Sequence, residues 1–311
     1  MNMNGGPARR HRAILEDIAR RAMRNRGLLP DFSPQVLIEL ERIRGPAATP
    51  GEGLRDLTPL LWSSIDNDDS RDLDQLTVAE GMPGDTIKIF VAVADVAALV
   101  KKGSAIDEHA RSNTTSVYTA AMIFPMLPEK LSTDLTSLSF RSERLSLVIE
   151  MVIGPDGSVR DSRIFRARVR NQAKLAYNGV GAWLEGAGPV PESVAGVPGL
   201  EENLRLQDRA ARRLRHLRHV HGALSLETIQ AKAIFDGDRL RDFEVQNKNR
   251  ATDLIEDFMI AANGVTARFL TSRKFPSLRR VVRAPKRWDR IAEIAGKREF
   301  RLPAQPDSKA L

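Results

Sequence analysis

A two-residue period in the apolar side chains predicts β-strands in the middle of the chain. Between residues 87 and 94, isoleucine or valine recurs at every second position, and the pattern stops at Asp95. This two-residue period is typical of a strand with one more apolar face. Residues 145–153 and 159–169 flank Gly-Pro-Asp-Gly at 154–157, which is a strong hairpin signal. We therefore expect a sheet in this part of the chain.

Helical patterns predominate towards both ends. Up to about residue 44, many arginines surround a sparse apolar stripe, and Gly27 is placed to end a first helix. A second helix is expected over 33–43. Further along the chain, helices are predicted over 105–112 and, rich in arginine, over 200–220.

A last long helix is predicted to begin at Asp253, because apolar residues then recur with helical spacing. Asp253 as N-cap and Glu256 three residues later would form a capping-box pair. The stretch 179–199 is rich in glycine and proline, and we expect it to be a surface loop.

The clearest linker is Pro-Ala-Ala-Thr-Pro-Gly-Glu-Gly at 46–53. It divides the chain into a basic helical N-terminal segment with its linker, residues 1–50, and a larger domain, residues 51–311. Mixed strands and surrounding helices in the larger domain predict an α+β fold. The tail from Lys297 has no recognisable terminus, so we expect this domain to be incomplete at its C-terminus.

Charge and composition narrow the function. The chain has 48 lysines and arginines against 40 acidic residues. The net charge of +8 predicts an anionic partner, and nucleic acid is the leading candidate. A GC-rich genome that prefers arginine codons is the alternative explanation. The absence of cysteine excludes disulfides, thiolate zinc sites and a cysteine nucleophile. Without a signal peptide or a bilayer-length apolar run, we predict no membrane partner and a cytoplasmic location.

Five aspartates lie within nine positions, at Asp66, Asp68, Asp69, Asp72 and Asp74. Carboxylates packed so closely repel one another unless the loop is solvated or a hard cation binds among them. Leucine, isoleucine and tryptophan precede the run, and leucines lie in and after it. These apolar flanks favour a loop that enters a core.

Three kinds of acidic loop have carboxylates at such close spacing. A calcium-binding EF-hand needs glycine at its sixth position and glutamate at its twelfth, where this loop has Arg71 and Thr77. A solvated turn with Arg71 and Arg55 as partners remains open. A magnesium site for phosphodiester hydrolysis also remains open, since two ions about 3.5–4 Å apart are held by carboxylates such as those of Asp66, Asp72 and Asp74.

The run from Ile65 to Gln75 resembles the signature of the ribonuclease II (RNB) family, in which Ile-Asp and four or five variable residues precede Asp-[aromatic or Leu]-Asp-Asp. Three further blocks follow in the family's order. The sequence at the end of the predicted strand, up to Asp95 and Val96, resembles the family's Ile-Ala-Asp-Val segment. Residues 115–128 contain segments that resemble its Thr-Ser-Val-Tyr and Pro-Met-Leu-Pro motifs. Residues 255–263 look like Glu-Glu-x-Met-x-x-Ala-Asn.

The resemblance implies an RNB-type catalytic domain and a magnesium-dependent exoribonuclease. Such an enzyme hydrolyses single-stranded RNA from its 3′ end and releases nucleoside 5′-monophosphates. Asp66, Asp72 and Asp74 match the acidic residues that hold Mg²⁺. Asp72 and Asp74 are the expected catalytic residues, and the chemistry depends most on Asp74. Tyr118 matches a tyrosine that positions the 3′-terminal nucleotide, and Asp257 falls in a substrate-facing region.

The departures from the family pattern leave a second hypothesis open. Gln75 replaces the fourth aspartate, and Leu226 stands where many members carry an aromatic residue that sandwiches the last bases. The family's Pro-Ile-Arg-Arg block, whose arginine steadies the scissile phosphate, is not found in these 311 residues. The alternative is therefore a catalytically impaired, RNA-binding fragment or paralogue of the same family. A structural cation loop without any RNA role is a third possibility.

Overall fold

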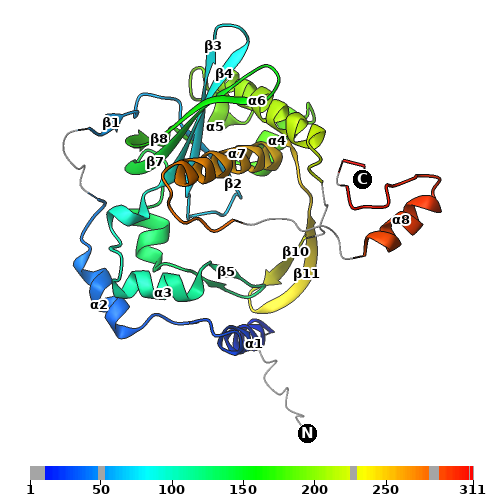
Figure 1. Ribbon diagram of the computed structural model, residues 1–311. Helices are drawn as coiled ribbons and strands as arrows, with labels where there is room; N and C mark the ends of the chain where they lie inside the picture. Colours follow the sequence, from blue (N-terminus) through cyan, green and yellow to red (C-terminus); the bar gives the residue numbers. More distant parts are fainter. Residues whose placement is uncertain (1–10, 48–52, 225–229, 280–286, 308, 311) are drawn as a thin grey trace.

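A seven-stranded mixed sheet forms the centre of the fold in the computed structural model (Figure 1). The structure describes residues 11–47, 53–224, 230–279, 287–307 and 309–310. The strand order is β1-β8-β7-β4-β3-β2-β9, with parallel pairs at β1/β8 and β2/β9 and antiparallel pairs elsewhere. The strands are β1 (Arg55–Asp56), β2 (Ser63–Asp66), β3 (Gln75–Met82), β4 (Thr86–Ala94), β7 (Glu143–Ile153), β8 (Val159–Arg170) and β9 (Ala173–Ala176). The predicted strand and hairpin are thus confirmed.

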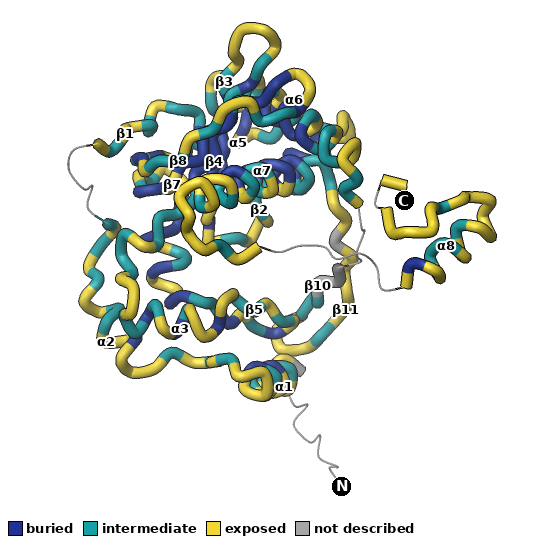
Figure 2. Tube along the Cα trace, viewed as in Figure 1, coloured by how far each residue is buried: buried dark blue, intermediate teal, exposed yellow. Residues whose placement is uncertain are grey.

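Helices cover one face of this sheet. They are α4 (Tyr177–Leu184), α5 (Glu192–Ala195), α6 (Leu200–Val220) and α7 (Arg250–Ser272). Ile87, Ile89 and Val91 of β4 pack against these helices in the largest apolar core. The intervening Phe90 and Ala92 are also buried, on the opposite face, where they pack with Trp62. Strand β4 is therefore apolar on both faces, and not mainly on one, because both faces of the sheet are covered (Figure 2).

Two predictions made from the sequence are wrong in this region. The stretch 179–199 is not a surface loop, because it contains most of α4 and all of α5, and Val180, Trp183 and Val194 are buried in the main core. Helix α7 begins at Arg250, and its capping box consists of Asn249 and Thr252. The Asn249 side chain accepts hydrogen bonds from the backbone N–H groups of Ala251 and Thr252, so the helix starts before Asp253.

A second layer of short elements lies below the sheet in Figure 1. It contains α1 (His11–Asn25), α2 (Pro34–Arg42), η1 (Val96–Ala98), α3 (Ala105–Asn113), β5 (Val117–Tyr118), β6 (Ile123–Phe124) and the π-helical η2 (Lys130–Leu135). Val36 of α2, Ile106 of α3 and Leu131 of η2 share one small core. The helices predicted over 33–43 and 105–112 are confirmed, and α2 packs on elements that follow the linker.

The sequence patterns also missed a hairpin and a short helix near the C-terminal end. The hairpin of β10 (Gln230–Asp236) and β11 (Arg239–Gln246) runs from the end of α6 towards α1, along one side of the molecule in Figure 1. Helix α8 (Trp288–Gly296) lies apart from the sheet, with the Trp288 ring N–H donating to the Pro303 carbonyl oxygen at 2.8 Å. In the described part of the chain, no helix is both long enough and apolar enough to cross a membrane.

Candidate active site

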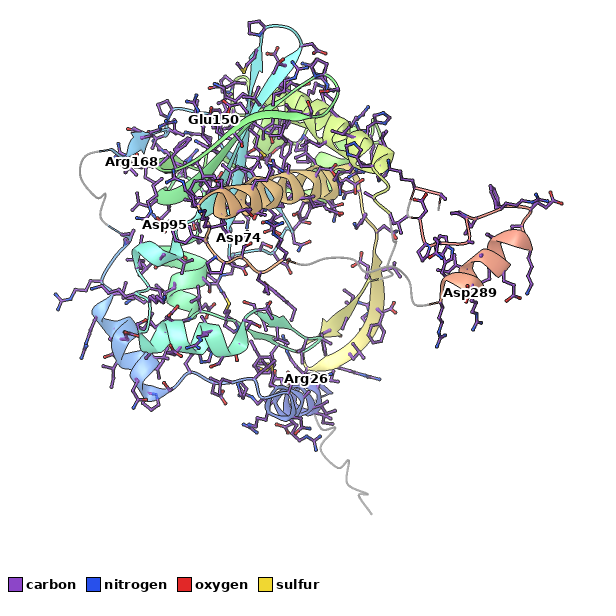
Figure 3. All side chains as sticks on the ribbon, in the orientation of Figure 1. Arg26, Asp74, Asp95, Glu150, Arg168 and Asp289 are labelled. Atoms are coloured by element: carbon purple, nitrogen blue, oxygen red, sulfur yellow. The ribbon has the colours of Figure 1, made fainter. Side chains whose placement is uncertain are left out.

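The acidic loop connects two neighbouring strands of the sheet. Asp66 is the last residue of β2, and Asp74 directly precedes β3. The part of the loop that leads into β3 is held by the buried Leu73. Its backbone N–H donates to the Ser137 hydroxyl oxygen at 3.1 Å, and its carbonyl oxygen accepts from the N–H of Leu138 at 2.7 Å. The Asp74 carbonyl accepts from the N–H of Ala94 at 3.0 Å. The sheet therefore brings Asp66 and Asp74 to the same edge, and Figure 3 shows Asp74 between the sheet and the lower layer.

The outer part of the loop is folded into a turn and tied to β9. The backbone N–H of Asn67 donates to the Asp66 carboxylate at 2.7 Å, and that of Ser70 donates to the Asn67 carbonyl at 3.1 Å. The Lys174 ammonium donates to the Ser70 carbonyl at 2.7 Å. Lys174 thus holds the loop from the neighbouring strand, and its positive charge lies close enough to Asp66 to stabilise that carboxylate.

Electrostatic repulsion couples the three predicted metal ligands. Burial of the carboxyl group, followed by the negative charges of Asp66 and Asp72, raises the pKa of Asp74 to about 6. Burial also raises the pKa of Asp66, against the hydrogen bonds from Asn67 and Ser70 and the charge of Lys174. Parts of the Asp74 side chain still reach solvent, so the carboxylate is accessible although it has lost much of its hydration.

Tyr118 joins this cluster from a distant part of the sequence. It lies on β5, 46 residues after Asp72 in the sequence. Its hydroxyl donates a long hydrogen bond of 3.4 Å to the Asp72 carboxylate. Tyr118 is 65% exposed as a residue, which leaves its ring available to a ligand. Burial of the hydroxyl and the nearby Asp72 raise the pKa of Tyr118. The structure therefore places Tyr118 with Asp72, close enough to Asp74 and Asp66 for their charges to act on it.

Tyr177 is a further residue of the site that the sequence patterns did not reveal. It is the first residue of α4 and directly follows Ala176, which pairs with Asp66 in the β2/β9 ladder. Burial and the charges of Asp66 and Asp74 raise the pKa of its hydroxyl. Neither Tyr177 nor Lys174 has a sequence signal, because their nearness to the acidic loop depends on the parallel pairing of two strands about 110 residues apart.

Asp257 lies in a different setting. It is on α7, only 2% exposed, and accepts a hydrogen bond at 3.0 Å from the Arg215 guanidinium while also pairing with Arg218. These contacts join α6 to α7. Burial raises the pKa of Asp257, and the two arginines oppose that shift. The structure thus gives Asp257 two arginine partners, and its contact with substrate stays a prediction.

Gln75, in the place of the family's fourth aspartate, is buried. Its amide nitrogen donates to the Ile65 carbonyl oxygen at 3.4 Å, so this end of the side chain is directed at the β2 backbone. Leu226, the other departure from the family pattern, lies outside the described residues.

The donor chemistry of the loop fits a divalent cation. Asp66, Asp72 and Asp74 offer only oxygen, which hard cations such as Mg²⁺ prefer, and a bound cation would relieve the repulsion that raises the pKa of Asp74. Across the described ranges, however, no three histidine, cysteine or acidic side chains converge closely enough to hold an ion. The ligands have the required chemistry, and binding an ion requires their side chains to draw together.

Comparisons with known proteins identify the family of this chain. Residues 54–309 match the RNB domain. Ribonuclease R of Escherichia coli K12 is 36% identical over 234 residues, which cover 74% of this chain and 28% of that protein. Exoribonuclease 2 of Escherichia coli O157:H7 is 33% identical over 227 residues, covering 71% of this chain and 35% of that protein. The chain therefore spans about a third of the length of these relatives.

A solved structure shows the same fold. Mycoplasma genitalium RNase R, in complex with ribose-methylated single-stranded RNA, superposes with a TM-score of 0.82 at 23% identity, covering 96% of this chain and 46% of that one. The mixed sheet with its surrounding helices is therefore an RNB-type α+β fold, as the resemblance implied. The RNB match covers most of the chain, and the relatives exceed 30% identity over more than two thirds of it. This protein belongs to the RNB family of ribonucleases.

Proposed function

We propose that the chain carries the catalytic centre of a magnesium-dependent exoribonuclease. In this proposal it hydrolyses single-stranded RNA from the 3′ end and releases nucleoside 5′-monophosphates. The observation that supports the proposal best is the coupling of Asp66, Asp72 and Asp74, with Tyr118 hydrogen-bonded to Asp72. Ribonucleases of the RNB family are generally metal-dependent, and the oxygen-only donor set favours Mg²⁺.

Each residue has a distinct part in the proposed reaction. Asp66, Asp72 and Asp74 would hold the cation, which when bound would neutralise charge on the attacked phosphodiester and make water a better nucleophile. Lys174 and the turn at Asn67 keep the Asp66 carboxylate in place. The exposed Tyr118 ring would position the terminal base, and its hydroxyl remains within reach of Asp72.

The direction of degradation is tested with end-labelled RNA. An oligo(A) of about 20 nucleotides labelled at its 3′-terminal nucleotide should release labelled 5′-AMP in the first turnover, in the presence of Mg²⁺. The same RNA labelled at its 5′ end should shorten stepwise. Release of the 5′ label first, or large internal fragments, would show that the polarity or the reaction type is wrong.

A second candidate function is RNA binding without hydrolysis. It is favoured by Gln75, whose amide brings no charge and is directed at the Ile65 carbonyl oxygen. Loss of one electrostatic stabiliser lowers catalytic rates by roughly 10²–10³-fold. RNA binding with a steep salt dependence, but no 5′-AMP release at high Mg²⁺, would identify this function.

A further inference from the structure

The outward face of α1 carries arginines that have no partner in the described structure. Arg21 and Arg24 are exposed one helical turn apart and line a surface depression of about 490 Å³ together with Ile14, Asp17 and Arg20. Arg20 is ion-paired with Asp31 at 2.5 Å and lies over the Phe124 ring. Among the described residues, no hydrogen bond or ion pair engages the Arg21 or Arg24 side chain. Two neighbouring guanidinium groups are thus free to bind an anion.

The inward face of α1 is packed on the hairpin that carries Tyr118. Ala19 and Met23 are buried against Phe124 of β6. Phe124 pairs with Val117 of β5, and the next pair in the ladder joins Ile123 to Tyr118. Helix α1 therefore lies directly on the two-stranded ribbon whose other strand supplies the tyrosine of the candidate active site.

Arg12 strengthens this connection at the start of the helix. Its guanidinium donates to the carbonyl oxygen of Ala121, in the turn between β5 and β6, at 3.2 Å. It also lies 5.4 Å from the centre of the Phe235 ring, while its backbone N–H donates to the Asp238 carbonyl at 3.2 Å. Arg12 thus fixes α1 to both the β5–β6 turn and the tip of the β10–β11 hairpin. A ligand held on the outer face of α1 is consequently held relative to Tyr118.

We propose that the outer face of α1 binds the RNA backbone, with Arg21 and Arg24 contacting phosphates upstream of the 3′ end held at Tyr118. The inference rests on the proposed function for the position of that 3′ end. Helix α1 precedes the residues that match the RNB domain, so this contact lies outside the matched region. The planar arginine fork matches phosphate oxygens, and the net charge of +8 favours a polyanion.

The double variant Arg21→Gln/Arg24→Gln tests this contact. Affinities for a 20-nucleotide and a 4-nucleotide oligo(A) are measured in EDTA, so that binding is read without hydrolysis. We expect roughly tenfold weaker binding of the 20-mer, and a salt dependence shallower by about 1.4 in the log–log slope for two lost phosphate contacts. Binding of the 4-mer, and its hydrolysis where the wild-type protein shows any, should be unchanged.

Arg298→Gln/Arg301→Gln is the matched control, because it removes the same charge from two exposed arginines with the same spacing in the C-terminal tail. Equal 20-mer affinities and salt slopes for the two double variants would overturn the proposal. So would an α1 variant that keeps its RNA affinity but sediments differently, since the face would then contact a second copy of the chain. Failure of hydrolysis by the wild-type protein would contradict the proposed function alone, because the α1 contact is measured by binding.

Discussion

At the scale of single residues, the Asp74 carboxyl group connects the fold with the chemistry. The fold that positions it also removes part of its hydration and places it within range of the charges of Asp66 and Asp72, and these effects together raise its pKa to about 6. A site that needs all three groups ionised is thus destabilised when no cation is present.

This repulsion predicts a dependence of stability on pH. The pKa of Asp74 in the folded protein, about 6, lies above its ordinary value of 3.8, so the folded state binds more protons between these values. Stability should therefore fall as the pH rises from about 4 through about 6. Asp74→Asn removes this effect and should raise the Tm in EDTA at neutral pH, with no gain near pH 4. A lower Tm for the Asn variant at neutral pH would contradict the assignment.

Tyr118 offers a separate test at the residue scale. The residue is 65% exposed and its hydrogen bond to Asp72 is long at 3.4 Å, so the ring should matter more than the hydroxyl. Stacking of a base on an aromatic ring contributes about 1–3 kcal/mol. Tyr118→Ala should raise KM for oligo(A) roughly tenfold or more, while Tyr118→Phe stays near wild type. A loss in Tyr118→Phe equal to that in Tyr118→Ala would assign the role to the hydroxyl.

At the scale of elements, the start of α7 provides a direct test of the corrected capping box. Asn249→Ala removes the side chain that accepts from two backbone N–H groups, and should lower the free energy of unfolding by about 1 kcal/mol. Glu256→Ala breaks only an exposed pair with Lys248 and should change it by less than about 0.5 kcal/mol. Denaturant unfolding measures the change in unfolding free energy for both variants. A larger decrease for Glu256→Ala than for Asn249→Ala would favour the capping box of Asp253 and Glu256 that the sequence predicted.

The elements that the sequence predicted well carry strong local signals. Helix α2 has Ser33 as its N-cap, and the β7–β8 hairpin surrounds a glycine- and proline-containing turn. Helices α4 and α5 were missed because the glycines and prolines of this stretch are typical of a loop. The apolar residues Val180, Trp183 and Val194 are buried only through packing in the core that α6 and α7 share. The β10–β11 hairpin was also missed, since none of its residues whose burial the structure describes, 233–245, is buried.

In the candidate site, too, residues close together in the sequence were predictable, and residues brought together by folding were not. Asp66, Asp72 and Asp74 lie within nine positions, so their proximity was predictable, and the resemblance pointed to Tyr118 beside them. Lys174 and Tyr177 were not, because strand pairing brings them to the loop. The ion pairs of Asp257 with Arg215 and Arg218 were hidden for a similar reason, since they form only when α6 packs on α7.

At the scale of the whole molecule, the charge distribution predicts how salt affects activity. A basic protein attracts a polyanion and releases its counterions, while the proposed reaction would take place in one small acidic loop. KM for long RNA should therefore rise steeply between about 0.05 and 0.2 M salt, with a much smaller change in kcat. A KM independent of salt over this range would show that the positive surface does not bind the substrate.

The most direct test of the proposed catalytic centre compares two aspartates of the same loop. Release of 5′-AMP from oligo(A) is measured with Mg²⁺ for the wild-type protein, Asp74→Asn and Asp68→Asn, since Asp68 is an exposed residue of the loop that we do not place among the ligands. We predict near wild-type release by Asp68→Asn and at least about 100-fold slower release by Asp74→Asn. Equal rates for wild type and Asp74→Asn would contradict the account.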